Sequence, residues 1–177
     1  MPTIQPSAPT TRTRLVRWIR AGLLTGVVDG LFSSVLSVFF YHSTATRLFQ
    51  GVAATLLGQG ALEGGTHTAA IGLLMHFGVA FTWSAILLLL VDHTTRLQRL
   101  LQAPLGTVKL SVVWGPLIWV TMSCLVIPVV GHRAPVFNVR WWIQFFGHMV
   151  FVALPMVSMV ASRARMREAS TFTPRSA

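Results

Sequence analysis

The stretch GLLTGVVDGLFSSVLSVFFYH, residues 22–42, gives the clearest indication of the fold class. It is almost entirely apolar, yet it carries one carboxylate, Asp29, near its middle. A helix needs about 20 mainly apolar residues to cross a lipid bilayer. Residues 20–41 hold eleven Leu, Val and Phe side chains. Each favours insertion by about 0.3 to 0.6 kcal/mol, which offsets the cost of roughly 3 kcal/mol for a central Asp. We therefore expect residues 20–41 to form a membrane-spanning helix.

Composition extends this expectation to the whole chain. Of its 177 residues 53% are hydrophobic and only 10% are charged, and the mean hydropathy of +0.66 is far above that of a soluble domain. Three further apolar runs are long enough to span a bilayer, at about 67–91, 107–130 and 141–161. The sequence thus predicts an all-α fold, a bundle of four transmembrane helices that forms a single membrane domain over residues 18–162.

The basic residues predict the orientation of this bundle. The chain has 14 Lys and Arg against 4 Asp and Glu, and they lie between the apolar runs. Eleven of them precede the first span, follow the second or follow the fourth, whereas Arg47, Arg133 and Arg140 lie on the other side. This positive-inside pattern predicts cytoplasmic termini in a bacterial inner membrane, with the lipid bilayer as partner. An uncleaved signal anchor is favoured over a cleaved signal peptide, because no A-x-A site ends the run.

The remaining segments are expected to lie outside the membrane core. Residues 1–17 are predicted to be a disordered basic cytoplasmic arm, and residues 163–177 a basic cytoplasmic tail. No zinc-finger spacing or RNA-binding motif accompanies the basic charge, so nucleic acid is not an expected partner. Between the first two spans, apolar positions recur at a helical period. They predict a short amphipathic helix over about 46–62 that lies at the outer interface, and a re-entrant hairpin is the alternative.

Small residues on the first span predict close helix packing. Gly22, Gly26 and Gly30 repeat every four residues. In lipid, this spacing lets two helix backbones approach closely. We expect this face to pack within the bundle, and homo-oligomerisation through it is the alternative. Prolines at 116, 128 and 155 are expected to bend the third and fourth spans, since each leaves a backbone carbonyl without its helical partner.

Counting depth along each span at about 1.5 Å per residue places Asp29, His76 and His148 at roughly 18, 14 and 10 Å from the outer edge. Ionisable residues at such depth tend to face the interior of a bundle and to be functional. We therefore expect Asp29 to face His76 or His148. The predicted buried polar layer also includes residues of the third and fourth spans, namely Thr121, Ser123 and Gln144.

This polar layer has several interpretations. It is either structural, fixing the register of the helices by hydrogen bonds, or a path that conducts protons or a small solute. Alternatively, His76 and His148 are the axial ligands of a b-type haem in an electron-transfer subunit, with Gly72 and Ala80 leaving room for the macrocycle. A metal site is not expected, because two histidines and one acid lack a tight ligand spacing.

Catalytic and redox motifs give little support to other functions. The sequence has no GxSxG, HExxH, P-loop or GxGxxG motif in a suitable context, so we expect no enzymatic activity. An intramembrane hydrolase would need Ser123 or Cys124 beside a histidine. Cys124 is the single cysteine, which excludes an internal disulfide.

Four motifs carry a resemblance to a known group of proteins: GLLTGVVDG, RLFQGVAATLLG, GGTHTAAIGLLMHF and HMVFVALP. With them, residues 18–162 resemble small, uncharacterised bacterial four-helix inner-membrane proteins related to the YagU-like proteins. The resemblance implies four spans, an outer interfacial helix, and recurrence of the positions of Asp29, His76, His148 and Pro155. It implies no chemistry for any of these residues.

Overall fold

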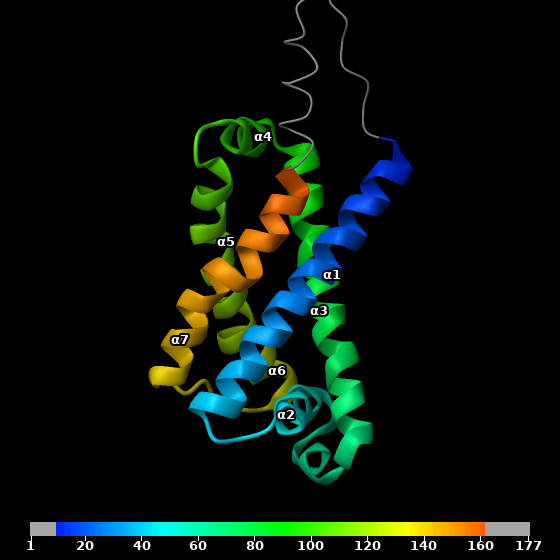
Figure 1. Cartoon of the computed structure of the whole chain (residues 1–177), viewed down its shortest axis with the longest axis vertical. Helices are drawn as coiled ribbons and strands as arrows, with labels where there is room; N and C mark the ends of the chain where they lie inside the picture. Colours follow the sequence, from blue (N-terminus) through cyan, green and yellow to red (C-terminus); the bar gives the residue numbers. More distant parts are fainter. Residues whose placement is uncertain (1–9, 162–177) are drawn as a thin grey trace, which may run out of the picture.

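The computed structural model describes residues 10–161, and in this range every regular element is helical (Figure 1). Four of its helical segments are long and apolar enough to cross a membrane: Thr11–Phe40, Gly65–His93, Gly106–Gly131 and Val139–Ala161. The expected tail at 163–177 and the first nine residues of the expected arm lie outside the described residues.

The first long helix starts earlier than the sequence predicted. It comprises α1 (Thr11–Val35) and a π-helical end, η1 (Leu36–Phe40), so residues 11–17 are helical rather than disordered. The Thr10 side chain caps the helix by accepting a bond from the Thr13 N–H. Arginines near a helix N-terminus oppose its dipole. Here Arg14 and Arg17 form ion pairs with the carboxylate of Asp92, at 3.0 and 3.6 Å. The sequence did not predict that Asp92 lies beside them.

The segment between the first two long helices folds back against the second. It consists of α2 (Ala45–Leu57) and a 3₁₀ turn, η2 (Gln59–Glu63), separated at Gly58, whose φ is +78°. α2 lies across the end of the bundle opposite the termini and packs on α3 (Gly65–His93) (Figure 1). The contact is very close, since a Cβ at Gly72 would lie 1.8 Å from the Phe49 carbonyl oxygen.

A short helix, α4 (Thr95–Gln102), joins α3 to the third long helix. That helix comprises α5 (Gly106–Thr121), a π-helical segment η3 (Met122–Val126) and α6 (Ile127–Gly131). The fourth comprises α7 (Val139–Gly147), a π-helical segment η4 (His148–Ala153) and a helical end that reaches Ala161. Both π-helical segments directly precede a proline-containing turn, at Pro128 and Pro155, where a missing N–H alters the hydrogen-bond pattern.

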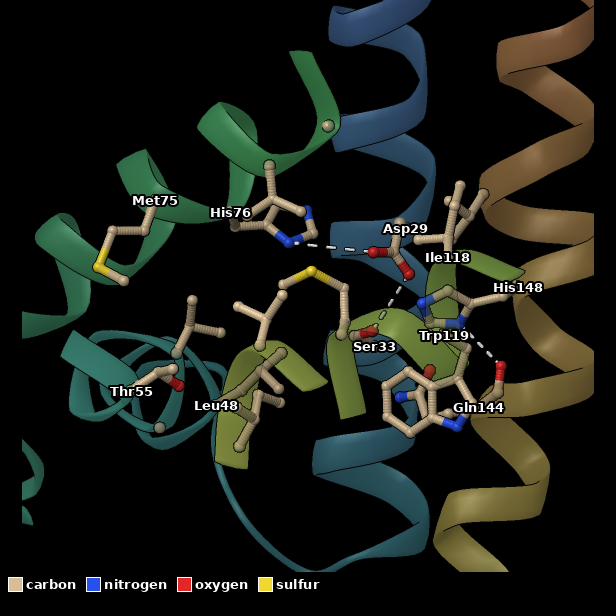
Figure 2. A pocket seen from close by; sticks show the side chains of 18 of the residues that line it. Asp29, Ser33, Leu48, Thr55, Met75, His76, Ile118, Trp119, Gln144 and His148 are labelled. Carbon is tan, nitrogen blue, oxygen red and sulfur yellow. Dashed lines mark hydrogen bonds and ion pairs between the residues drawn. The ribbon is translucent and has the colours of Figure 1, made fainter. Parts of the chain in front are cut away.

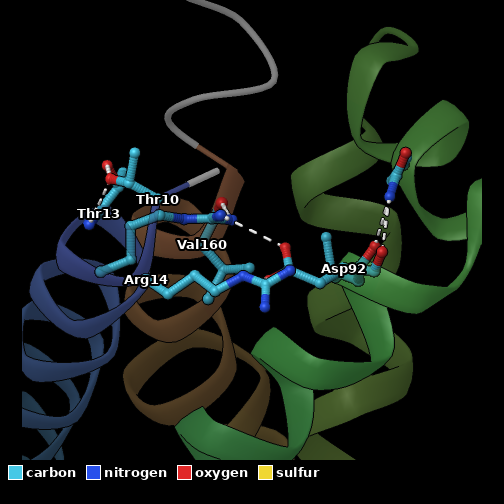
Figure 3. A network of polar contacts seen from close by, with 8 residues as sticks. Thr10, Thr13, Arg14, Asp92 and Val160 are labelled. Atoms are coloured by element: carbon cyan, nitrogen blue, oxygen red, sulfur yellow. Dashed lines mark hydrogen bonds and ion pairs between the residues drawn. The ribbon is translucent and has the colours of Figure 1, made fainter. Parts of the chain in front are cut away.

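The main cluster of buried apolar side chains lies toward the end of the bundle that carries Thr10 and Ala161. Among its members are Leu87, Leu101, Trp114, Met156 and Val160, and we call it the core cluster. At the same end, Arg17 donates to the Val160 carbonyl, so Arg14, Arg17, Asp92 and Val160 connect α1, α3 and the fourth helix (Figure 3). We call these four residues the Asp92 cluster.

Large apolar side chains cover the outside of the long helices. Leu31 of α1, Leu74 of α3 and Val113 of α5 are 62%, 75% and 65% exposed, and many other Leu, Val and Phe side chains share this exposure. Contiguous apolar surface of this kind is rare on soluble monomers and marks contact with a membrane or another protein.

Candidate functional site: a cavity lined by aspartate, histidine and arginine

A cavity of about 560 Å³ lies in the half of the bundle near α2, beside the core cluster. All four long helices and α2 contribute to its lining. Its volume lies within the range of pockets that bind small molecules, about 300 to 1,000 Å³.

One face of the first helix supplies a polar strip to this cavity. Residues four apart share a helix face. Accordingly, the lining includes the series Thr25, Asp29, Ser33, Ser37 and Tyr41. The Ser33 hydroxyl lies 3.5 Å from Asp29 Oδ1, and Ser37 donates to the Thr44 carbonyl where the chain enters α2. The apolar run of residues 22–42 thus has one polar edge, and the structure turns it inward.

Asp29 and His76 form a pair across α1 and α3 (Figure 2). His76 Nε2 lies 3.0 Å from the Gly26 carbonyl oxygen, which only accepts, so Nε2 carries a proton. His76 Nδ1 faces Asp29 Oδ2 at 3.9 Å, and the two side chains are only 14% and 17% exposed. Asp29 and His76 thus face each other across α1 and α3, largely shielded from solvent.

His148 lines the same cavity from the fourth helix, and Asp29 lies between the two imidazoles in the view of Figure 2. Its Nδ1 donates to the Gln144 carbonyl at 2.7 Å, which leaves Nε2 as an acceptor in the neutral ring. The ring lies 4.8 Å from that of Trp119 on α5. The two helices approach closely at Gly115, which has no Cβ. A Cβ there would lie 2.5 Å from the His148 carbonyl oxygen.

Several buried polar atoms of the lining have no protein hydrogen-bond partner. Within the described residues these are Thr25 Oγ1, Tyr41 Oη, Trp119 Nε1, Arg133 Nε and Gln144 Oε1. Buried polar groups are nearly always paired with protein or with water. Their gathering at one cavity therefore indicates a wet interior or one that receives a polar ligand.

Three arginines surround the end of the cavity near α2. We call Arg47, Arg133 and Arg140 the outer arginines, because the charge pattern placed them on the outer side. Arg47 donates to the Leu62 carbonyl at 2.6 Å and Arg133 to the Thr55 hydroxyl at 2.9 Å. In the sequence these residues served only as topology signals. Arg47 lies far from Arg133 and Arg140 in the chain, so no local pattern indicated that the three converge.

Arg140 lies over the ring of Tyr41, with its guanidinium carbon 4.2 Å from the ring centre. Tyr41 follows the last residue of the first long helix and so lies just outside that span. Burial raises the pKa of the Tyr41 hydroxyl above its ordinary value, and the positive charge of Arg140 partly opposes this shift.

Two residues of the expected polar layer lie away from the cavity lining. Ser123 is buried in η3, where its hydroxyl accepts from Trp141 Nε1 at 3.1 Å and lies 3.5 Å from Cys124 Sγ. Thr121 is likewise absent from the lining, which includes Asp29, His76, Gln144 and His148. Ser123 thus makes its hydrogen bond with an indole rather than with a histidine.

The glycine face of α1 is covered within the chain. A Cβ at Gly22 or Gly26 would lie 2.2 or 2.5 Å from the rings of Phe81 and Phe77, and one at Gly30 would lie 3.4 Å from His76 Nε2. All three neighbours belong to α3. A second copy of the chain would have to displace α3 to use this face, so the geometry supports packing within one bundle.

Two residues that suggested a haem site, Gly72 and His76, make other contacts in the structure. The space beside Gly72 is filled by the backbone of α2, and His76 Nε2 is engaged by the Gly26 carbonyl. No group of three or more His, Cys, Asp or Glu side chains in residues 10–161 lies together as a metal site would require.

Neither a family model, nor a curated protein, nor a solved structure matches the chain, so the assignment of function depends on the geometry described above.

Proposed function

We propose that the chain is a four-span integral membrane protein that admits a small solute to its internal cavity and exchanges a proton there at the Asp29–His76 pair. The observation that carries this proposal is the cavity of about 560 Å³ whose lining includes Asp29, His76 and His148. The proposal places both ends of the chain in the cytoplasm of a bacterium and assigns no enzymatic reaction.

Membrane insertion is supported by surface and charge together. Four helices are long and apolar enough to cross a bilayer, and their outward side chains are largely Leu, Val and Phe. The eleven basic residues on the side of the termini exceed the three on the other side, as the positive-inside rule requires for cytoplasmic ends. With this orientation, α2 lies at the outer side and the cavity lies in the outer half of the bundle.

The closed inner end favours a carrier or binding protein over an open channel. Between the cavity and the termini lie the core cluster around Trp114 and Met156 and the ion pairs of Asp92. A proton or solute that enters from the outer side therefore meets packed side chains. Transfer across the bilayer would require a second conformation in which the Asp92 cluster separates.

The competing interpretation is that the polar layer only joins helices. The bond from His76 to the Gly26 carbonyl connects α3 to α1 and fits that role. A purely structural role, however, does not require Asp29 to be titratable, and it leaves the unpaired polar atoms of the lining without a function. The two interpretations differ in whether Asp29 exchanges protons with the outer solution.

Proton movement into liposomes tests the proposal. The full chain is reconstituted in phosphatidylcholine liposomes that contain a pH-sensitive dye, and a potassium gradient with valinomycin drives protons inward. We expect Asp29→Asn to reduce proton entry to the level of protein-free liposomes. Glu63→Gln serves as control because it alters an exposed carboxylate outside the lining. Unchanged flux in Asp29→Asn, or no flux above protein-free liposomes in the wild type, would reject the proton role.

A further inference from the structure

We propose that the outer arginines bind the acidic group of an organic anion whose apolar body extends into the cavity. This inference rests on the proposed function, because it names the chemical class of the solute that the cavity admits. Its evidence is separate from that for the proton pair and comes from the charges, the unpaired donors and the walls near α2.

The charge at this end of the cavity is not balanced by the protein. Among the described residues, no carboxylate lies within 4.0 Å of Arg47, Arg133 or Arg140. Asp92 pairs with Arg14 and Arg17 at the opposite end, and Asp29 pairs with His76. Positive groups gathered beside a cavity attract an anion, and arginine is suited to carboxylate and phosphate because its planar donors match their oxygens.

Donors for such an anion are already in place. Arg133 Nε and Tyr41 Oη are buried and have no protein hydrogen-bond partner, and both residues line the cavity. Arg133 is also fixed by its bond to the Thr55 hydroxyl, and the ring of Tyr41 lies against Arg140. The guanidinium of Arg133 therefore holds one position with a free N–H, which is the arrangement expected of a preformed anion site.

The rest of the cavity suits an apolar body with one further polar group. The walls of the cavity are mostly apolar, and they include Val52, Met75, Val79, Ile118, Met122 and Val126. Gln144 Oε1, one turn from Arg140 on α7, and Trp119 Nε1, whose ring lies beside His148, are an acceptor and a donor without protein partners. Twelve residues of helix separate Asp29 from Tyr41, or about 18 Å. The site thus fits an extended amphiphile rather than a compact inorganic ion.

Such an anion has two sources. It enters from the bilayer if it is the phosphate of a lipid headgroup with part of its chain, or from the outer solution if it is a soluble carboxylate or phosphate ester. The shared chemistry is an acidic oxygen group joined to an apolar chain. Competition experiments separate the two sources.

The binding experiment uses the full-length protein in phosphatidylcholine nanodiscs with dansyl-undecanoic acid as a fluorescent probe. We expect saturable binding of the acid and much weaker binding of its methyl ester, which lacks the charge. Arg133→Gln should weaken binding of the acid at least about tenfold, as expected when a buried charge loses its partner. Arg133→Lys keeps the charge without the planar donors and should give an intermediate loss. Arg96→Gln is the matched control, because Arg96 is exposed on α4 and does not line the cavity.

Phosphatidylglycerol added to the nanodiscs will compete if a lipid headgroup fills the site, and hexanoate in solution will compete if a soluble anion does. Equal binding of acid and ester, no saturable binding in the wild type, or equal loss in Arg133→Gln and Arg96→Gln overturns the inference. Failure here with Asp29-dependent proton entry intact removes only the anion site. Anion binding without proton entry removes only the proton role, so the two results are distinguishable.

Discussion

At the scale of single residues, His76 connects the glycine series of α1 with Asp29, two features that are separate in the sequence analysis. The glycine series of α1 lets α3 approach, and the Gly26 carbonyl then accepts a bond from His76 Nε2 at 3.0 Å. This bond turns Nδ1 toward Asp29, one turn further along α1. The small residues of the first helix therefore orient the imidazole that faces the carboxylate.

The titration of Tyr41 reports on the end of the cavity near α2 and can be measured directly, because Tyr41 is the single tyrosine of the chain. Burial disfavours the charged tyrosinate and raises the pKa of Tyr41, and Arg140 partly opposes this. We expect the tyrosinate absorbance of the protein in detergent to appear with a midpoint above the ordinary value of about 10.

Removing the positive charge in Arg140→Gln should move this midpoint further upward, since the charge that favours tyrosinate is lost. Arg96→Gln should leave it unchanged. A midpoint at or below the ordinary value in the wild type would mean that Tyr41 is open to water.

At the scale of elements, the docking of α2 on α3 closes one side of the cavity. α2 contributes Leu48, Gly51, Val52, Thr55 and Leu56 to the lining, and its approach depends on Gly72. Gln50 adds a bond from its side-chain amide to the Gly65 carbonyl at 3.0 Å. The expectation of an amphipathic helix in this segment followed from its periodicity, whereas its contact with α3 depends on a glycine some twenty residues away in the chain.

Gly72→Ala tests this contact. The new Cβ would lie 1.8 Å from the Phe49 carbonyl oxygen, so the two backbones must separate. We expect a loss of about 1 to 3 kcal/mol in the free energy of unfolding, measured by denaturant titration in micelles.

Gly78→Ala is the matched control on the same helix, because a Cβ there has nothing within 4 Å. It should be neutral or stabilising by up to about 1 kcal/mol, since alanine favours a helix over glycine. Equal stability of the two variants would show that α2 does not pack on Gly72.

At the scale of the whole molecule, the proposed topology predicts which loops face each side of the membrane. In a Cys124→Ser background, a cysteine at Gly60 in η2 should react with a membrane-impermeant maleimide on intact cells. A cysteine at Arg96 in α4 should react only after the membrane is permeabilised. Labelling of Arg96→Cys on intact cells would reverse the orientation, and labelling of neither after permeabilisation would contradict exposure of both loops.

The sequence predicted the positions of the long helices better than it predicted which of their faces meet in the interior. The length of an apolar run is a local property, so four long apolar helices follow directly from hydropathy. The start of α1 at Thr11 did not follow, because Arg14 and Arg17 need Asp92 from another helix. The cavity could not be predicted either. Its shape depends on which face each helix turns inward, and the outer arginines come from three separate segments.

The Asp92 cluster and the Asp29–His76 pair are joined by a single continuous helix, α1, with Arg17 and Asp29 on it about 18 Å apart. Because a helix transmits a tilt along its length, any motion that pulls Arg17 away from Asp92 also shifts Asp29 relative to His76. In the proposed function, opening at the Asp92 cluster and release of the proton would then be two ends of the same movement, and proton entry would depend on that movement.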